Sequence, residues 1–339
     1  MQSSIAPAPP GAAGPSRATL LRRFLQAYWL RPENALWMTL RSDVLGHAPL
    51  GPPVIDVSCG DGVFMFLHCG GEFDPSFDVF QAVIGLDRVR DEHVDMFECL
   101  DDAYRPRMEA PPSSTIAVGC DLKPALLAKA ERLGIYGRLV RADNNQPLPF
   151  DDEAFETVYC NAAYWVRNIG SFLDELRRIT RCGGRIILQV KLDSIRRYTL
   201  ASHRAVLGDR FLAIIGRGRA ECWPTLADRR TWEARFSTAG LIIDQAVPFV
   251  TRTHAHLWDI GLRPIAPLLA RMANALSPDT RIAIKADWVD LFCDLAGPFC
   301  DPNLDIGLGT DEPAEIQYVL LPRDMTARSG RPGKAAALD

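Results

Sequence analysis

A strand, a glycine-rich turn and the start of a helix follow one another between Val54 and Phe64. Val54–Val57 is a β-branched run that predicts a buried strand, and the apolar residues from Val63 onward predict a helix. The small residues between them let the backbone approach a ligand, which the N–H groups at the start of the helix would face. The stretch predicts an α/β protein with a ligand site at this turn; the alternative is an ordinary strand–turn–helix connection.

Two turn patterns with different ligands can be compared with this stretch. A dinucleotide turn has the form G-x-G-x-x-G, whose positions fall on Ser58, Gly60 and Val63, so only Gly60 fits. The form acid-x-G-x-G-x-G matches at Asp56, Gly60 and Gly62, with Ser58 in place of the first glycine. A serine is tolerated there if its φ stays negative. On these residues the stretch resembles motif I of the class I S-adenosylmethionine-dependent methyltransferases, which implies that Asp56, Ser58, Gly60 and Gly62 bind S-adenosylmethionine.

An acidic residue, Asp121, ends the next strand-like run, Thr115–Cys120. One carboxylate at the end of a parallel strand can accept hydrogen bonds from two adjacent ribose hydroxyls. The run Val118–Leu122 is similar to the second strand of the same family, and the resemblance implies that Asp121 holds the ribose, beside Leu122. The alternative is that Asp121 caps the following helix, and the two roles can coexist.

A third strand, Leu139–Asp143, is followed by Asn144, a Leu-Pro-Phe turn and a fourth strand that ends at Asn161. This order resembles the small-molecule, methyltransferase type 11-like subgroup of the family. The resemblance implies that Asp143 meets the adenine amino group, which can only donate hydrogen bonds, and that Asn144 follows along the base. Asn161, assigned to the cofactor site, and Tyr164 stand where an acceptor would face the methyl group.

The resemblance implies a Rossmann-like class I methyltransferase sheet of seven strands, with strand seven antiparallel and helices on both faces. A helix, the Gly183-Gly184 turn and the apolar strand Ile186–Val190 follow in the family's order. Residues 239–243 and 316–321 are expected to form the last two strands. Two helical insertions are expected to cover the substrate.

We expect these domain boundaries: a disordered tail over residues 1–16, a helical segment over 17–50, a methyltransferase domain over 51–325 with insertions at about 68–113 and 250–314, and a disordered tail over 326–339. The helical segment is expected either to pack into the core or to form a lid over the cofactor. The first acid is Glu33, after several arginines, so a transit peptide is an alternative to a loose tail.

The composition is that of an ordinary globular protein, with 339 residues, 47% hydrophobic residues and a formal net charge of -4. This charge gives no support for wholesale nucleic-acid binding, and no apolar run reaches the length of a membrane span. The nine cysteines are scattered without metal-ligand spacing, so we expect reduced thiols, no metal site and a cytoplasmic location.

A sulfonium methyl group is an activated electrophile, so the enzyme must mainly hold a nucleophile in line with it. A hydroxyl acceptor also calls for a base. His254 and His256 are the candidates, because Asp259 follows and could orient an imidazole. Two purely structural histidines are the alternative. With Tyr164, they make up the expected catalytic residues.

The expected function is methyl transfer from S-adenosylmethionine to a small-molecule acceptor, by O-methylation of a natural-product or sugar-type substrate. Transfer to nitrogen or carbon, and a non-catalytic S-adenosylmethionine-binding partner subunit, are the alternatives. A nicotinamide-dependent reductase is disfavoured by the failed dinucleotide pattern. The acceptor and the oligomeric state stay open.

Overall fold

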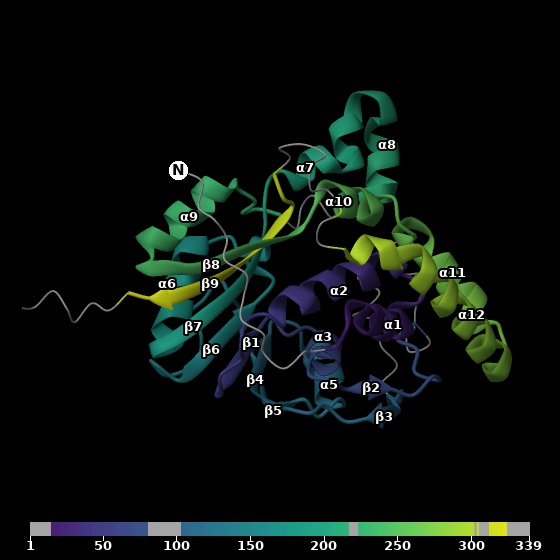
Figure 1. Cartoon of the computed structure of the whole chain (residues 1–339), viewed down its shortest axis with the longest axis horizontal. Coiled ribbons are helices and arrows are strands. Elements are labelled where there is room, and N and C mark those ends of the chain that lie inside the picture. Colours follow the sequence, from purple (N-terminus) through teal and green to yellow (C-terminus); the bar gives the residue numbers. More distant parts are fainter. Residues whose placement is uncertain (1–14, 81–102, 217–222, 302–303, 305–311, 324–339) are drawn as a thin grey trace, which may run out of the picture.

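In the part of the chain that the structure describes, seven strands form one mixed sheet in the order β5-β4-β1-β6-β7-β9-β8 (Figure 1). This computed structural model describes residues 15–80, 103–216, 223–301, 304 and 312–323. The strands of the sheet are β1 Val54–Val57, β4 Ile116–Asp121, β5 Tyr136–Arg141, β6 Phe155–Cys160, β7 Thr180–Lys191, β8 Leu241–Val250 and β9 Glu315–Pro322.

The pairing directions confirm the predicted fold class. β1 is parallel to β4 and β6, β4 is parallel to β5, and β6 is parallel to β7. β9, the last strand in sequence, is antiparallel to both of its neighbours, β7 and β8. The carboxyl ends of β1, β4, β5, β6 and β7 therefore lie along one edge of the sheet, together with the first residue of β9.

Helices cover both faces of the sheet (Figure 1). α6 (Ile169–Ile179) and α9 (Arg229–Thr238) pack on one face, and α1 (Arg17–Tyr28), α2 (Pro32–Leu45), α3 (Val63–His68) and α5 (Pro124–Glu131) lie on the other. Neighbouring residues of a strand point to opposite faces. Ile186 and Leu188 accordingly pack with α6 and α9, while Ile187 packs in the cluster that contains α1 and α2.

The N-terminal helices are part of the hydrophobic core. Leu21, Phe24 and Leu25 are almost fully buried, and the ring of Phe24 stacks on Phe64 of α3 with the centroids 6.0 Å apart. Pro32 is the first residue of α2. Proline suits a first helical position, because its missing N–H would have no partner there.

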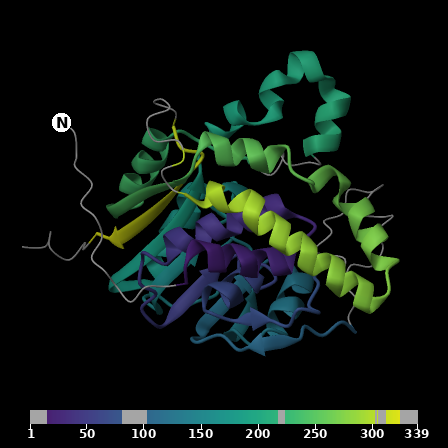
Figure 2. The same ribbon diagram turned by 45° about the vertical axis from the view of Figure 1, so that its right-hand side comes forward.

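The two segments proposed as insertions, at about 68–113 and 250–314, connect strands of the sheet. The first contains the hairpin of β2 (Glu72–Phe73) and β3 (Met108–Ala110); residues 81–102 lie outside the described residues. The second contains α10 (Arg252–Asp259), η5 (Arg263–Ile265), α11 (Ala266–Asn274), α12 (Pro278–Ala296) and η6 (Gly297–Cys300). α12 packs against α1, and the two lie side by side in Figure 2.

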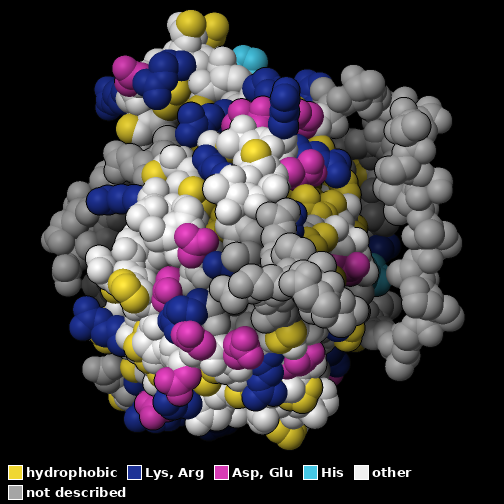
Figure 3. Space-filling model, turned by 90° about the vertical axis from the view of Figure 1, so that its left-hand side faces the viewer, with side chains coloured by type: hydrophobic (Ala, Val, Ile, Leu, Met, Phe, Trp, Pro, Cys, Tyr) yellow, Lys and Arg dark blue, Asp and Glu magenta, His cyan; other side chains and the backbone are white. Residues whose placement is uncertain are grey.

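The remaining described elements are η2 (Ala163–Trp165), α7 (Ile195–Tyr198), η3 (Leu200–His203) and α8 (Arg204–Gly216). On the face drawn in Figure 3, Lys and Arg side chains are interspersed with Asp and Glu side chains. No helix among the described residues is long and apolar enough to cross a membrane. Most of the two predicted tails, residues 1–14 and 326–339, lies outside the described residues.

Substitution of Gly184 in β7 tests the packing of the turn into that strand. A Cβ atom there would lie 2.7 Å from the backbone oxygen of Glu156, which cannot move without disturbing β6. We expect Gly184→Ala to lower the free energy of unfolding by about 1–3 kcal/mol in urea denaturation. Gly170→Ala in α6 is the control, because its Cβ would meet no atom within 4 Å. Equal stability of the two variants would contradict this packing.

Candidate active site

The turn after β1 uses left-handed backbone conformations at three alternate residues. Ser58, Gly60 and Gly62 have φ values of 67°, 59° and 78°. The expectation that Ser58 keeps a negative φ is therefore wrong, and the conformation costs an L-residue about 1–2 kcal/mol. Its hydroxyl accepts a hydrogen bond of 2.8 Å from Asn144 Nδ2, which helps to hold the strained residue in place.

The two glycines of the turn serve different purposes. A Cβ on Gly62 would lie 3.1 Å from the Cβ of Ala130, so Gly62 is required for close packing against α5. A Cβ on Gly60 would meet no described atom within 4 Å, so open space lies in front of the backbone at this residue. The turn thus packs tightly on one side and offers a bare backbone on the other.

Asp121 joins the end of β4 to this turn. Its Oδ2 accepts a hydrogen bond of 3.0 Å from the Gly60 N–H, and its Oδ1 accepts one of 2.9 Å from the Lys123 N–H. A carboxylate has about four acceptor positions, so both oxygens keep a lone pair for further donors. The side chain of the next residue, Leu122, is 48% exposed. An adenosine fits this combination, because ribose hydroxyls need acceptors and a purine face needs an apolar neighbour.

Asp143 and Asn144 follow β5, next to β4. Asp143 is half-buried, and its Oδ1 accepts a hydrogen bond of 2.9 Å from the Asn145 N–H. Asn144 is tied to Ser58, as described above. The ends of β4 and β5 are joined further by a hydrogen bond of 3.0 Å from the Ala142 N–H to the Asp121 carbonyl oxygen. The residues predicted from three separate strands are thus brought together along one edge.

Asp56 lies behind the turn and is only 4% exposed. The hydroxyl of Tyr136 donates a hydrogen bond of 2.6 Å to its Oδ2. Burial raises the pKa of this carboxyl to about 7, although the Tyr136 hydrogen bond acts in the opposite direction. Tyr136 fits because Gly119 has no side chain; a Cβ there would lie 2.8 Å from its ring.

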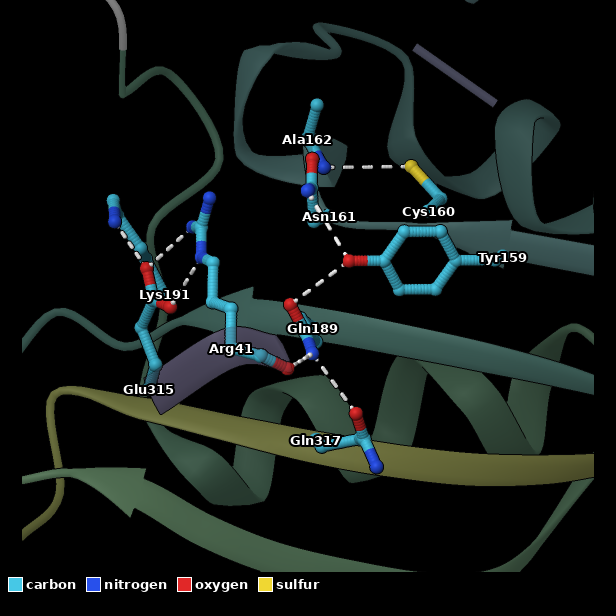
Figure 4. Close-up of polar contacts among 9 residues, drawn as sticks. All are labelled: Arg41, Tyr159, Cys160, Asn161, Ala162, Gln189, Lys191, Glu315 and Gln317. Atoms are coloured by element: carbon cyan, nitrogen blue, oxygen red, sulfur yellow. Dashed lines mark hydrogen bonds and ion pairs between the residues drawn. The ribbon is translucent and has the colours of Figure 1, made fainter. Parts of the chain in front are cut away.

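A polar chain continues along the same edge at β6, β7 and β9 (Figure 4). Asn161 Nδ2 donates to the hydroxyl of Tyr159, which donates to Gln189 Oε1; both distances are 3.2 Å. Gln189 Nε2 donates to Gln317 Oε1 at 2.9 Å and to the Arg41 carbonyl oxygen at 3.0 Å. Asn161, directly after β6, is thereby connected to α2 and to the antiparallel strand β9.

Three buried charges stand beside this chain, and the sequence analysis missed all of them. Arg41 of α2 forms a bidentate pair with Glu315 of β9, at 3.1 and 2.8 Å, and Lys191 at the end of β7 also donates to Glu315. All three residues are at most 4% exposed. The available signal was that Lys191 and Glu315 directly adjoin apolar strands, where charged residues are rarely buried without partners.

Aromatic rings surround the ammonium group of Lys191. Its Nζ lies 4.3 Å from the ring centroid of Trp37, 4.9 Å from that of Tyr164 and 5.4 Å from that of Trp258. These distances are typical of cation–π contacts. Burial lowers the pKa of Lys191, while Glu315 opposes that effect. Tyr164, a predicted catalytic residue, therefore stands beside two buried cations and one anion.

The two histidines have different surroundings. His254 is 1% exposed, and its Nδ1 accepts a hydrogen bond of 3.0 Å from the Thr251 N–H. Its Nε2 must then carry the proton, which it donates to the Phe299 carbonyl oxygen at 2.6 Å. With both ring nitrogens engaged, His254 caps α10 and has no lone pair for a base. His256 is exposed, and its ring lies 6.3 Å from that of Tyr198.

The family model described as "Methyltransferase domain" matches residues 103–188, which contain β4 to β6 and most of β7. Together with the strand order, this match confirms the resemblance to class I S-adenosylmethionine-dependent methyltransferases. It also confirms the enzyme class and S-adenosylmethionine as the methyl donor. A comparison with curated proteins gives no match to the chain.

Several solved structures are similar to this chain. One is an S-adenosylmethionine-dependent methyltransferase from Mesorhizobium loti, with 15% identity, coverage of 84% of this chain and 96% of that chain, and a TM-score of 0.40. The cyclase SpnF has 15% identity, coverage of 84% and 81%, and a TM-score of 0.42. Geranyl diphosphate methyltransferase in complex with S-adenosylmethionine has 14% identity, coverage of 85% and 88%, and a TM-score of 0.39.

The raised pKa of Asp56 predicts a pH dependence of stability. In the unfolded chain this carboxyl ionises near pH 4, whereas in the folded protein it does so near 7. The contribution of Asp56 to the free energy of unfolding is therefore fully present below about pH 4, and it falls by a few kcal/mol as the pH rises to about 7. We expect Asp56→Asn to lack this fall in urea unfolding measured across that range. The buried His68, whose pKa is lowered to about 4, changes the stability in the opposite direction over the same pH range. Its effect is the same in both proteins, so it cancels when the stability profile of Asp56→Asn is subtracted from that of the unaltered protein. Parallel pH profiles would contradict this account.

Loss of Glu315 would leave Arg41 and Lys191 buried without their anion. We expect Glu315→Gln to lower the free energy of unfolding by about 3–5 kcal/mol, because uncompensated buried charges are costly. Glu312→Gln is the matched control: Glu312 pairs with Arg197 at 3.0 Å on the surface and should contribute less than about 1 kcal/mol. Denaturation curves of both variants measure the difference, and a small effect at Glu315 would show that the cluster does not stabilise the fold.

Proposed function

We propose that the protein transfers the methyl group of S-adenosylmethionine to a hydroxyl group of a small molecule of the natural-product or sugar type. The observation that carries the proposal is the division of one sheet edge into two parts. The ends of β1, β4 and β5 offer bare backbone and carboxylates, and the ends of β6 and β7 offer aromatic rings and buried charge. The first part suits the methyl donor and the second suits the acceptor.

In this proposal Asp121 accepts hydrogen bonds from the ribose hydroxyls, and Leu122 packs on the purine. Asp143 and Asn144 bind the polar edge of the adenine. The backbone of the turn at Ser58, Gly60 and Gly62 lies against the methionine part, with Asp56 behind it and Asn161 beside it. The bound sulfonium supplies the activated methyl group, so the protein's own task is to align the acceptor.

The acceptor lies over β6 and β7, beneath α2 and α10, against Trp37, Tyr164 and Trp258. The three buried charges there, Arg41, Lys191 and Glu315, sum to one net positive charge. A positive site favours an oxyanion over a neutral hydroxyl and so lowers the pKa of an acceptor hydroxyl. This effect supports transfer to oxygen, because a hydroxyl with a lowered pKa is deprotonated more easily by a base.

In this proposal Tyr164 contacts the acceptor, and His256 receives the proton of the acceptor hydroxyl. The phenol of Tyr164 acts as a hydrogen-bond donor or acceptor. His256 is the candidate base because it is exposed on α10, which covers this part of the sheet. His254 is excluded from that role by its two hydrogen bonds.

The test is transfer of an isotopically labelled methyl group from S-adenosylmethionine to a panel of phenols, sugars, amines and carbon acids. We expect hydroxyl acceptors to be methylated, and Tyr164→Phe to lower kcat/KM by about tenfold or more, as for a lost hydrogen bond to a charged group. Tyr318→Phe is the control, because Tyr318 packs on the opposite face of the sheet, where its hydroxyl contacts Glu233 of α9. Methylation of amines alone would contradict oxygen transfer. Cofactor binding without transfer to any acceptor would favour the non-catalytic subunit.

A further inference from the structure

A cavity of about 320 Å³ lies between the first insertion and α12. Its walls are the loop Pro75–Asp78 after β2, three residues before β3, and the first turns of α12. Its volume falls in the range of small-molecule sites. A second, smaller hollow of about 40 Å³ shares Phe77 and Tyr104 with it and reaches Asp61 in the turn after β1. The cavity is therefore a neighbour of the cofactor turn, separated from it by two aromatic residues.

Four basic side chains line the cavity: Arg105, Arg107, Arg281 and Lys285. The acids nearby are Asp78 on the wall and Asp74 close to Arg107 and Lys285. These six charges sum to two net positive charges.

One of the four cations is neutralised within the wall. Arg281 Nε donates to Asp78 Oδ2 at 2.8 Å, and the Trp29 Nε1–H donates to the same oxygen at 2.9 Å. The Phe80 N–H donates to Asp78 Oδ1 at 2.9 Å, and the Asp78 N–H donates to the hydroxyl of Tyr104 at 2.9 Å. The Asp78 carboxylate is therefore held by three donors, and this side of the cavity is a preformed wall.

Lys285 is held differently. It is only 4% exposed, and its Nζ donates to two backbone oxygens, of Pro75 at 3.1 Å and of Phe77. Two of its three ammonium protons are thereby used on neutral groups, and the residue still lines the cavity. Burial lowers the pKa of Lys285 to about 8, with Arg281 acting in the same direction and Asp78 and Asp74 in the other. A buried ammonium without its own carboxylate is a strong attractor for an anion.

Arg105 and Arg107 also line the cavity and are exposed. Arg105 donates to the Tyr104 carbonyl oxygen at 3.1 Å. The guanidinium of Arg107 has no hydrogen bond or ion pair within the described part of the chain, so its planar donor edge is available to a carboxylate or phosphate. The rings of Phe77 and Tyr104 also line the cavity, and they suit the less polar part of a ligand.

We propose that this cavity binds a small molecule through a phosphate or carboxylate group, which is held between Lys285 and Arg107. The binding site is separate from the methyl-transfer edge, and the proposal does not rest on the function proposed above. The ligand is an oxyanion of low molecular weight, because the cavity is too small for more than such a group and one ring-sized part.

Calorimetric titration of the full chain with inorganic phosphate and with citrate tests this proposal and distinguishes a phosphate site from a carboxylate site. The ionic strength is held constant with sodium chloride. We expect saturable binding of at least one of the two anions, and Arg107→Gln should weaken it by about tenfold, as for a lost charge-assisted hydrogen bond. Arg230→Gln, an exposed arginine on α9, is the matched control and should bind as the unaltered protein does.

The pH dependence provides a second readout, with sulfate as the probe because its charge stays constant in this range. Binding should weaken as the pH rises through about 8, where Lys285 loses its proton. Lys285→Met should abolish both the binding and its pH dependence. The absence of saturable binding at millimolar phosphate and citrate would overturn the proposal. The proposal would also be overturned if Arg107→Gln bound the anion as tightly as the unaltered protein, or if Arg230→Gln lost as much affinity as Arg107→Gln.

Discussion

The hydrogen bond from the Gly60 N–H to the Asp121 carboxylate holds the turn after β1 against the end of β4. The turn can approach so closely only because Gly60 and Gly62 adopt left-handed conformations and Gly62 has no side chain to strike Ala130. Ser58, in the same turn, is held to β5 through Asn144. The backbone that we propose to face the methyl donor is thus fixed by side chains at the ends of two neighbouring strands.

A second constraint acts at the other half of the edge, where Arg41, Lys191 and Glu315 are buried together. Their hydrogen bonds connect α2, β7 and β9, which are far apart in sequence. The hydrogen-bonded chain from Asn161 through Tyr159 to Gln189 links this cluster to the donor half. The position of α2 over the sheet is therefore coupled, through polar contacts, to the strand ends at which we propose that methyl transfer takes place.

The sequence was informative where a local pattern determines the structure. Apolar runs that end in Asp121 and Asp143 predicted strands with carboxylates at one edge, and the antiparallel last strand followed from the resemblance. The sequence did not predict the features that depend on contacts between residues far apart in the chain. The φ of Ser58 depends on Asn144, 86 residues later, and the pairing of Arg41 with Glu315 spans 274 residues. His254 was a candidate base because Asp259 follows in the same segment, but its hydrogen bonds to Thr251 and Phe299 are visible only in three dimensions.

Calorimetric titration with S-adenosylmethionine tests most directly whether the turn after β1 and Asp121 at the end of β4 bind the methyl donor. The account predicts micromolar binding to the unaltered protein, and a loss of about tenfold to a hundredfold in Asp121→Ala, which removes the acceptor for the ribose hydroxyls. Asp228→Ala, which removes the cap of α9 instead, should leave the affinity unchanged. If Asp121→Ala binds S-adenosylmethionine as tightly as the unaltered protein, the carboxylate at the end of β4 does not hold the methyl donor.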